Sequence, residues 1–303
     1  MALKAKDETK VWAEAVIRHP PELTEAVANF FFEKGARAVV NEESSGLVTS
    51  RAGFGAPDLP LGLKGEVNAF LSDLTNIFNL ATPPTSEWRT VAYGDWAEKW
   101  KEGLEPVEVG PRLVVKPTWC DYQVGPNQVV LNLDPGMAFG TGHHPTTFHC
   151  LKGVETYFRD PKHAEASVLD VGTGSGILAM AAAALGRGRI VALDIDRDVL
   201  PVAAGNMALN GLAERIFLVC ADPAALKRQF DLILANLHRD ELMRLAPVLV
   251  GLGAPGARWI LSGLLESQAE EVAACFISLG LEQILRSVEK EWVTLTMGTR
   301  RER

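Results

Sequence analysis

The stretch "VLDVGTGSGIL", residues 168–178, places a glycine-rich loop between two apolar segments. From residue 167 onward, short runs rich in Val, Ile and Leu alternate with longer segments that carry apolar residues at helical spacing. This alternation is typical of a mostly parallel sheet with helices on both faces. The sequence therefore predicts a doubly wound α/β domain, in which a ligand lies beyond the carboxyl ends of the strands.

The three glycines of this loop, Gly172, Gly174 and Gly176, have the spacing G-x-G-x-G. Because they lack side chains, their backbone N–H groups can approach a ligand closely at the start of a helix. The fingerprint of dinucleotide-binding folds is G-x-G-x-x-G, and Ile177 stands where its last glycine would be. The loop favours a nucleoside ligand, and a tight turn without a ligand is the alternative.

Two acids follow the next two expected strands. Asp194 ends the first of them, where a carboxylate can accept hydrogen bonds from both hydroxyls of a ribose. Asp222 closes the second, a place suited to the edge of an adenine. The alternatives are a helix cap for Asp194 and a turn started by an Asp-Pro pair for Asp222. Together with the glycine loop, these acids indicate a nucleoside without a diphosphate, as in S-adenosylmethionine.

A second glycine-rich stretch, "LDPGMAFGTGHHPTTFHC" at 133–150, precedes this domain's main strands. It cannot continue a sheet, and its threonines enter an expected helix. We expect the loop to fold over the methionine end of the cofactor, with Phe139 as an apolar cover and Thr147 as a hydroxyl ligand. One loop would then hold the nucleoside while the other closes the site.

The histidines of this second loop could alternatively bind a metal. His143 and His144 are adjacent, so their side chains point apart on most backbones, and neither a helically spaced carboxylate nor a cysteine pair joins them or His149. Zinc needs about four such ligands, so no metal site is predicted, and His144 is expected to order the loop. The cysteines lie far apart and predict neither a disulfide framework nor a zinc site: Cys120, Cys150, Cys220 and Cys275.

The amino-terminal part reads as a small α+β unit. Strands are expected at "KVWAEAVI", "ARAVVNEE", "GEVNAFL" and "EWRTVAYGD", helices at "ELTEAVANFFFEKG" and "SDLTNIFNLA", and a loop at "SRAGFGAPDLPLGLKG". The resulting β-α-β-β-α-β order is that of the ferredoxin-like split motif. A short helix with Trp96 and Trp100 on one face follows. We therefore expect an α+β recognition domain at 1–94, a linker helix at 95–105 and a cofactor-binding domain at 106–303.

Composition limits the partners. The 303 residues carry a net charge of −8, which repels phosphate backbones and disfavours generic DNA binding. The amino terminus is charged, and the longest apolar run, "ILAMAAAAL", is far shorter than the roughly 20 residues that span a bilayer. We expect a cytoplasmic monomer without membrane contact, acting on a small molecule or a basic partner.

Several motifs together resemble the PrmA family, methyltransferases of large-subunit ribosomal protein L11: "DPGMAFGTGHHPTT", "VLDVGTGSGILAMAAAALG", "ALDID", "ANL" and "EKEWVTLTM". The resemblance runs over nearly the whole chain. It implies a class I fold with a seven-stranded Rossmann-like sheet, S-adenosylmethionine as cofactor, an amino-terminal substrate-recognition domain, and multiple methylation of lysine side-chain and N-terminal amines of that ribosomal protein. A related protein-lysine methyltransferase with another substrate is the alternative.

By position, the resemblance assigns cofactor contacts to Thr147, Gly172, Asp194 and Asn236, and Gly174 and Phe139 complete the predicted site. After Asn236 the sequence lacks the prolines and aromatic residue typical of methyltransferases of planar amines, which favours a tetrahedral amine as acceptor. No catalytic residue is assigned. Two other classes stay open, a nicotinamide-dependent oxidoreductase, which the glycine spacing disfavours, and a ribosome-binding module without catalysis.

Overall fold

The computed structural model describes residues 11–36, 38–44, 46–54, 62–78, 80, 82–92, 105–134 and 142–299. The chain divides into two compact units, Met1–Leu104 and Glu105–Arg303, and each is described by itself. Within the described ranges, the helices are all too short or too polar to cross a membrane.

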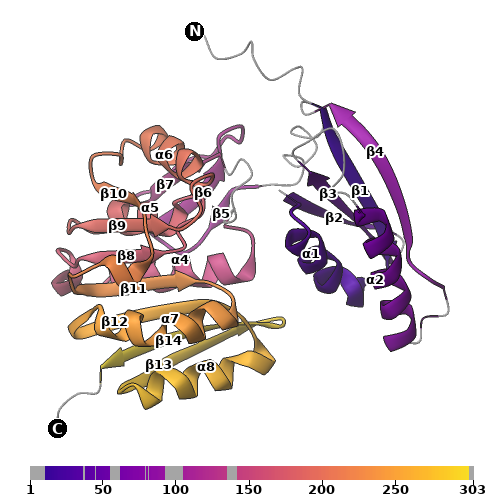
Figure 1. Ribbon diagram of the computed structural model, residues 1–303. Helices are drawn as coiled ribbons and strands as arrows, with labels where there is room; N and C mark the ends of the chain where they lie inside the picture. The colour runs from indigo at the N-terminus through magenta and orange to yellow at the C-terminus, as the bar shows by residue number, and fades with distance from the viewer. Residues whose placement is uncertain are drawn as a thin grey trace. The chain divides into compact units, whose positions relative to one another are not determined.

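The smaller unit is a four-stranded antiparallel sheet with two helices (Figure 1). Its elements follow the chain as β1 (Val11–His19), α1 (Thr24–Glu33), β2 (Ala38–Ser44), β3 (Leu47–Phe54), α2 (Leu63–Ile77) and β4 (Thr85–Ala92). The strands lie in the order β2-β3-β1-β4. Alternate residues of β1, such as Ala15 and Ile17, share one core with Val27 of α1 and Val67 of α2. Both helices therefore cover the same face of the sheet.

The prediction of one strand in this unit is wrong. The segment "GEVNAFL" lies inside α2, and the second inner strand is β3, which takes up the beginning of the expected loop. The reason is visible in the buried side chains of α2: Leu63, Val67, Leu71 and Leu74 recur at helical spacing. The expected linker helix at 95–105, with Trp96 and Trp100, lies outside the described residues except for its last position.

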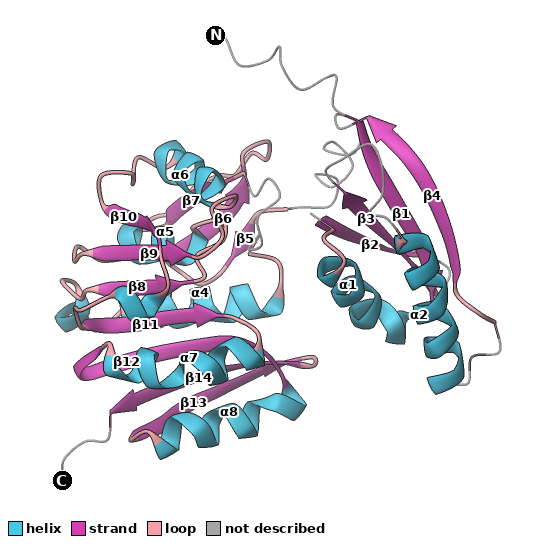
Figure 2. Cartoon of the chain, viewed as in Figure 1, coloured by secondary structure: helices cyan, strands magenta, loops and turns pink. Residues whose placement is uncertain are grey.

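The larger unit is built on a mixed seven-stranded sheet in the order β10-β9-β8-β11-β12-β14-β13 (Figure 2). Its strands are β8 (Val168–Val171), β9 (Ile190–Asp194), β10 (Ile216–Cys220), β11 (Phe230–Asn236), β12 (Gly253–Leu265), β13 (Leu281–Glu289) and β14 (Trp292–Thr299). The first five in this list pair in parallel, whereas β14 is antiparallel to both of its neighbours. The predicted doubly wound α/β domain is confirmed.

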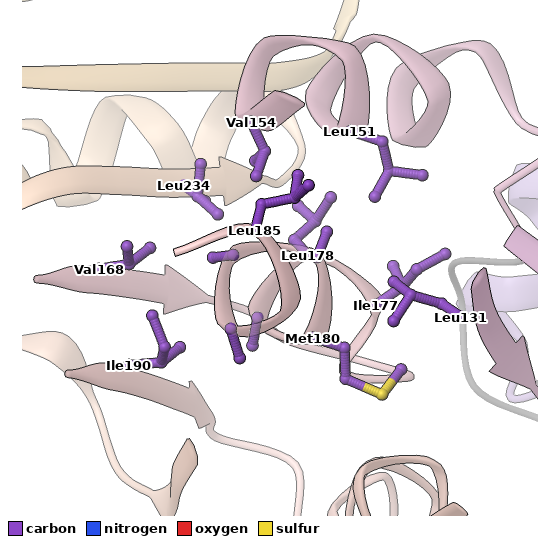
Figure 3. Close-up of a cluster of buried hydrophobic side chains, with 14 of the residues drawn as sticks. Leu131, Leu151, Val154, Val168, Ile177, Leu178, Met180, Leu185, Ile190 and Leu234 are labelled. Carbon is purple, nitrogen blue, oxygen red and sulfur yellow. The ribbon is translucent and has the colours of Figure 1, made fainter. Parts of the chain in front are cut away.

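Helices cover both faces of this sheet. Along β11, Leu232 and Leu234 join a core with α4 (Pro145–Tyr157), α5 (Ile177–Leu185) and α6 (Leu200–Leu209), and Figure 3 shows part of this core. The alternate residues Ile233 and Ala235 join a second core with α7 (Arg239–Gly251) and α8 (Glu266–Ser278). The period of two along the strand thus explains why β11 is apolar throughout.

A second, three-stranded sheet precedes α4. It consists of β5 (Val107–Glu108), β6 (Leu113–Pro117) and β7 (Val129–Leu133), with β6 and β7 parallel. The sequence predicts strands here but not that they form a sheet of their own. Since Leu131 and Leu133 are buried in the same core as α5 and α6, this sheet fixes where the second glycine-rich stretch begins.

Candidate functional site

The glycine loop turns sharply between β8 and α5. Its glycines adopt positive φ angles, +71° at Gly172, +52° at Gly174 and +84° at Gly176, a region that other residues rarely adopt. The Gly172 N–H donates to the carbonyl of Leu193 at 2.9 Å, which ties the loop to the end of β9. A Cβ on Gly172 would lie 2.4 Å from the Leu237 side chain, so the loop also packs closely against the segment after β11.

Asp194 is joined to this loop. Its Oδ2 accepts a hydrogen bond from the Gly174 N–H at 3.1 Å, and its Oδ1 accepts one from the Asp196 N–H at 3.0 Å. It does not cap the next helix, whose N-cap is Val199. Because each carboxylate oxygen can accept two hydrogen bonds, both keep capacity for a ligand hydroxyl. The backbone amides hold the carboxylate in one orientation beside the glycine loop.

Thr147 and Asn236 meet at the same edge of the sheet. Thr147 lies in the first turn of α4, where only 1% of it is exposed, and Asn236 is the last residue of β11. The Asn236 Nδ2 donates to the Thr147 Oγ1 at 3.3 Å. The structure therefore brings together Thr147, Gly172, Gly174, Asp194 and Asn236 around the carboxyl ends of β8, β9 and β11. The sixth predicted residue, Phe139, lies outside the described residues.

Asp170 belongs to this site but was not predicted. It is 1% exposed on β8, and its Oδ2 accepts hydrogen bonds from the Thr173 hydroxyl at 2.6 Å and the Ala179 N–H at 3.1 Å. Its Oδ1 has no hydrogen-bond partner among the described residues. Burial raises the pKa of Asp170 to about 6, and nearby Asp194 acts in the same direction. A buried acceptor without a partner beside a glycine cradle fits a site that receives a polar ligand.

Asp222, expected at an adenine edge, is exposed. It caps a short 3-10 turn by accepting from the Ala224 N–H at 2.8 Å, and it lies 3.6 Å from the Arg244 guanidinium. The turn-starting alternative therefore describes its observed contacts. The preceding Ala221 N–H donates to the Asp194 carbonyl, so Asp222 follows directly on the site.

The histidines near α4 have separate partners. His144 is the N-cap of α4, its Nδ1 lies 2.7 Å from the Thr146 hydroxyl, and its ring packs edge-on against Trp292. Burial lowers the pKa of His144, which favours the neutral ring. His149 Nε2 lies 2.9 Å from a carboxylate oxygen of Glu289. Across the described part of the chain, no group of three or more His, Cys, Asp or Glu could hold a metal.

Comparison with known proteins decides the family. Residues 11–300 match the sequence profile of the family described as Ribosomal protein L11 methyltransferase (PrmA). The chain belongs to this family.

Relatives of the PrmA family match over almost their full length. A ribosomal protein L11 methyltransferase of Geotalea uraniireducens is 40% identical, and the match covers 94% of this chain and 97% of the relative's chain. One of Pelotomaculum thermopropionicum is 39% identical with the same coverage. The crystal structure of a ribosomal protein L11 methylase from Lactobacillus delbrueckii subsp. bulgaricus is 32% identical, with a TM-score of 0.60, and covers 65% of this chain and 99% of that chain. The chain is thus a methyltransferase of the PrmA family with an α/β methyltransferase fold.

Proposed function

We propose that this chain transfers methyl groups from S-adenosylmethionine to lysine side-chain and N-terminal amines of ribosomal protein L11. The observation that carries the proposal is the convergence of the glycine loop, Asp194 and the Thr147–Asn236 pair at one edge of the sheet. The names of the relatives, together with their coverage of the chain, supply the substrate.

Each part of the site has a place in holding the cofactor. The backbone of the glycine loop, with positive φ angles at Gly172 and Gly174, lies against the nucleoside, and Asp194 accepts from the ribose hydroxyls. Thr147 and Asn236 contact the reacting end, and the Oδ1 of Asp170, which has no hydrogen-bond partner within the described ranges, accepts from a further donor. When bound, the cofactor supplies a methyl group on a cationic sulfonium.

The acceptor amine must be neutral to attack. A lysine with an ordinary pKa of about 10.4 is neutral only rarely at pH 7, and the free-energy cost is about 4.6 kcal/mol. Burying the amine beside a positive charge disfavours the ammonium form by desolvation and repulsion. Positioning at the edge that Asn236 occupies then supplies much of the catalysis, and no general base is assigned.

Within the smaller unit, residues 1–94 are proposed to form a ferredoxin-like domain that recognises the ribosomal protein. Its β-α-β-β-α-β order and the sheet order β2-β3-β1-β4 support this. Charged side chains lie on the face opposite the helices, where Arg89 with Glu87 at 2.8 Å is exposed and Arg51 with Glu14 at 3.5 Å is largely buried. Because ribosomal proteins are made in the cytoplasm, we propose that this chain acts in the cytoplasm.

A binding measurement and a methyl-transfer assay test this proposal. Calorimetry should detect binding of S-adenosylmethionine but not of NAD, whereas preference for NAD would favour an oxidoreductase. Transfer of labelled methyl groups to ribosomal protein L11, compared with another basic ribosomal protein, separates the proposed substrate from the alternative of a different protein lysine. Cofactor binding without transfer to either protein would favour a ribosome-binding module.

A further inference from the structure

Two asparagines, Asn206 in α6 and Asn210 at its C-cap, bind the outer edge of β7 and the residue that follows this strand. The Asn210 side chain, at the C-cap of the helix, accepts from the Asn132 N–H at 2.8 Å and donates to the Asn132 carbonyl at 2.7 Å. One turn earlier, the Asn206 Oδ1 accepts from the Asp134 N–H at 2.9 Å. Four residues along a helix rise about 6 Å and two residues along a strand about 6.6 Å, so the two side chains match alternate N–H groups of the strand.

Asn206 has a second partner that Asn210 does not. Its Nδ2 donates to the carbonyl of Ser175, in the glycine loop, at 3.0 Å. Only 2% of Asn206 is exposed, and both polar atoms of its side chain are used. The next residue of α6 also packs tightly against the glycine loop, because a Cβ on Gly176 would lie 3.1 Å from the Met207 side chain. One buried amide thus joins Asp134 to the glycine loop.

Further along the second glycine-rich stretch, the next described residue, Gly142, also lies near the glycine loop. Gly142, with φ +86°, would place a Cβ 3.5 to 3.6 Å from the side chains of Val115 and Ile177. Ile177 is the first residue of α5, directly after the glycine loop. Asp134 and Gly142 therefore both lie close to the glycine loop or to the residue that follows it.

We infer that Asn206 is a positioning residue that holds the chain at Asp134 against the glycine loop at Ser175 and so keeps the glycine loop in the conformation that receives the cofactor. The inference rests on the proposed function for the identity of that cofactor. The hydrogen bonds themselves are independent of it. Asn206 contributes through two backbone groups, and no contact between its side chain and the ligand is needed.

Asn206→Asp is the main test. The substitution keeps the size and the acceptor for the Asp134 N–H, but it replaces the donor to the Ser175 carbonyl with an oxygen that repels it. Asn210→Ala is the matched control, because it removes the two hydrogen bonds between the end of the same helix and Asn132 but none of the bonds to the glycine loop. Calorimetry with S-adenosylmethionine and denaturant unfolding are measured on the full chain for both variants, and Asn206→Ala extends the series.

The expected result is a dissociation constant at least fivefold higher for Asn206→Asp than for Asn210→Ala, even if the control loses as much stability. In methylation assays, KM for S-adenosylmethionine should rise while kcat at saturation changes less than threefold. Amide hydrogen exchange without cofactor should quicken in the glycine loop for Asn206→Asp, at Asp134 as well for Asn206→Ala, and only around residue 132 for the control.

A ratio of dissociation constants below fivefold, or unchanged exchange in the glycine loop of Asn206→Asp, would overturn the inference. Absence of S-adenosylmethionine binding by the unchanged chain would instead overturn the proposed function, and with it the role of Asn206 toward that cofactor. The exchange data would then show separately whether Asn206 holds the glycine loop.

Discussion

Thr147 and Asn236 are 89 positions apart in the chain, yet the Asn236 amide donates to the Thr147 hydroxyl at 3.3 Å. The contact joins the first turn of α4 to the carboxyl end of β11. The residue after Asn236, Leu237, approaches Gly172 so closely that a Cβ there would lie 2.4 Å from its side chain. Helix, strand end and glycine loop thus define one site.

Thr147→Val tests this contact. Valine has the shape of threonine but no hydroxyl, so the Asn236 amide loses its acceptor, and we expect S-adenosylmethionine to bind about fivefold more weakly, near 1 kcal/mol. Calorimetry measures the change. Thr147→Ser keeps the hydroxyl and should bind within about twofold of the unchanged chain; equal affinities for the Val and Ser variants would remove Thr147 from the site.

Asp194→Ala should weaken cofactor binding by about 1 to 3 kcal/mol, because charge-assisted hydrogen bonds to the ribose are lost together with the acceptor for the Gly174 N–H. Asp196→Ala is the control, since that side chain accepts from the Asp198 N–H and not from the glycine loop. Thermal-shift titration of both variants decides between them. Unchanged affinity in Asp194→Ala would refute the ribose assignment.

The alternation of apolar strands and helices was enough to predict the α/β domain, because strands buried on both faces must be apolar throughout. The glycine spacing and Asp194 were likewise found from sequence, since both lie at strand ends within one local unit. The strand predicted at "GEVNAFL" failed because a short apolar run suits a helix as well as a strand. Only the helical spacing of apolar residues over the longer range from Leu63 to Leu74 distinguishes a helix from a strand here.

Two residues, one in the site and one proposed to position it, had no local signal in the sequence. Asp170 stands in an apolar strand run, and its meaning depends on burial and on an Oδ1 without a partner among the described residues. Asn206 lies in an ordinary helix and gains its role only through Asp134, 72 positions away. Contacts between distant segments of this kind cannot be obtained from the spacing of residues in a single sequence.

Gly263→Ala should lower the free energy of unfolding by about 2 to 5 kcal/mol. Gly263 has φ +85°, and a Cβ would lie 2.4 Å from the Leu237 carbonyl oxygen, so strain adds to a collision with backbone. Gly211→Ala is the control, because Gly211 has φ +67° but nothing within 4 Å, and about 1 to 2 kcal/mol is expected. Urea unfolding of both variants measures the difference, and equal losses would contradict the close packing at Leu237.

Asp170 should titrate near pH 6, since burial raises its pKa to about 6 from about 3.9 in an unfolded chain. The folded state then binds this proton more tightly than the unfolded state does. The contribution of Asp170 to stability is therefore most favourable below about pH 4, falls as the pH rises toward 6, and stays low above it. Carboxyl ¹³C NMR, with Asp170→Asn to assign the signal, checks the value; a midpoint near 4 would contradict it.

The central claim is tested most directly by mass spectrometry of purified ribosomal protein L11 after incubation with this chain and S-adenosylmethionine. The account predicts mass gains in steps of one methyl group, with fragment ions that place them on lysine side chains or the amino terminus. It also predicts that Asp194→Ala slows these gains at limiting cofactor. An unchanged mass, under conditions where calorimetry shows the cofactor bound, would contradict the proposed substrate.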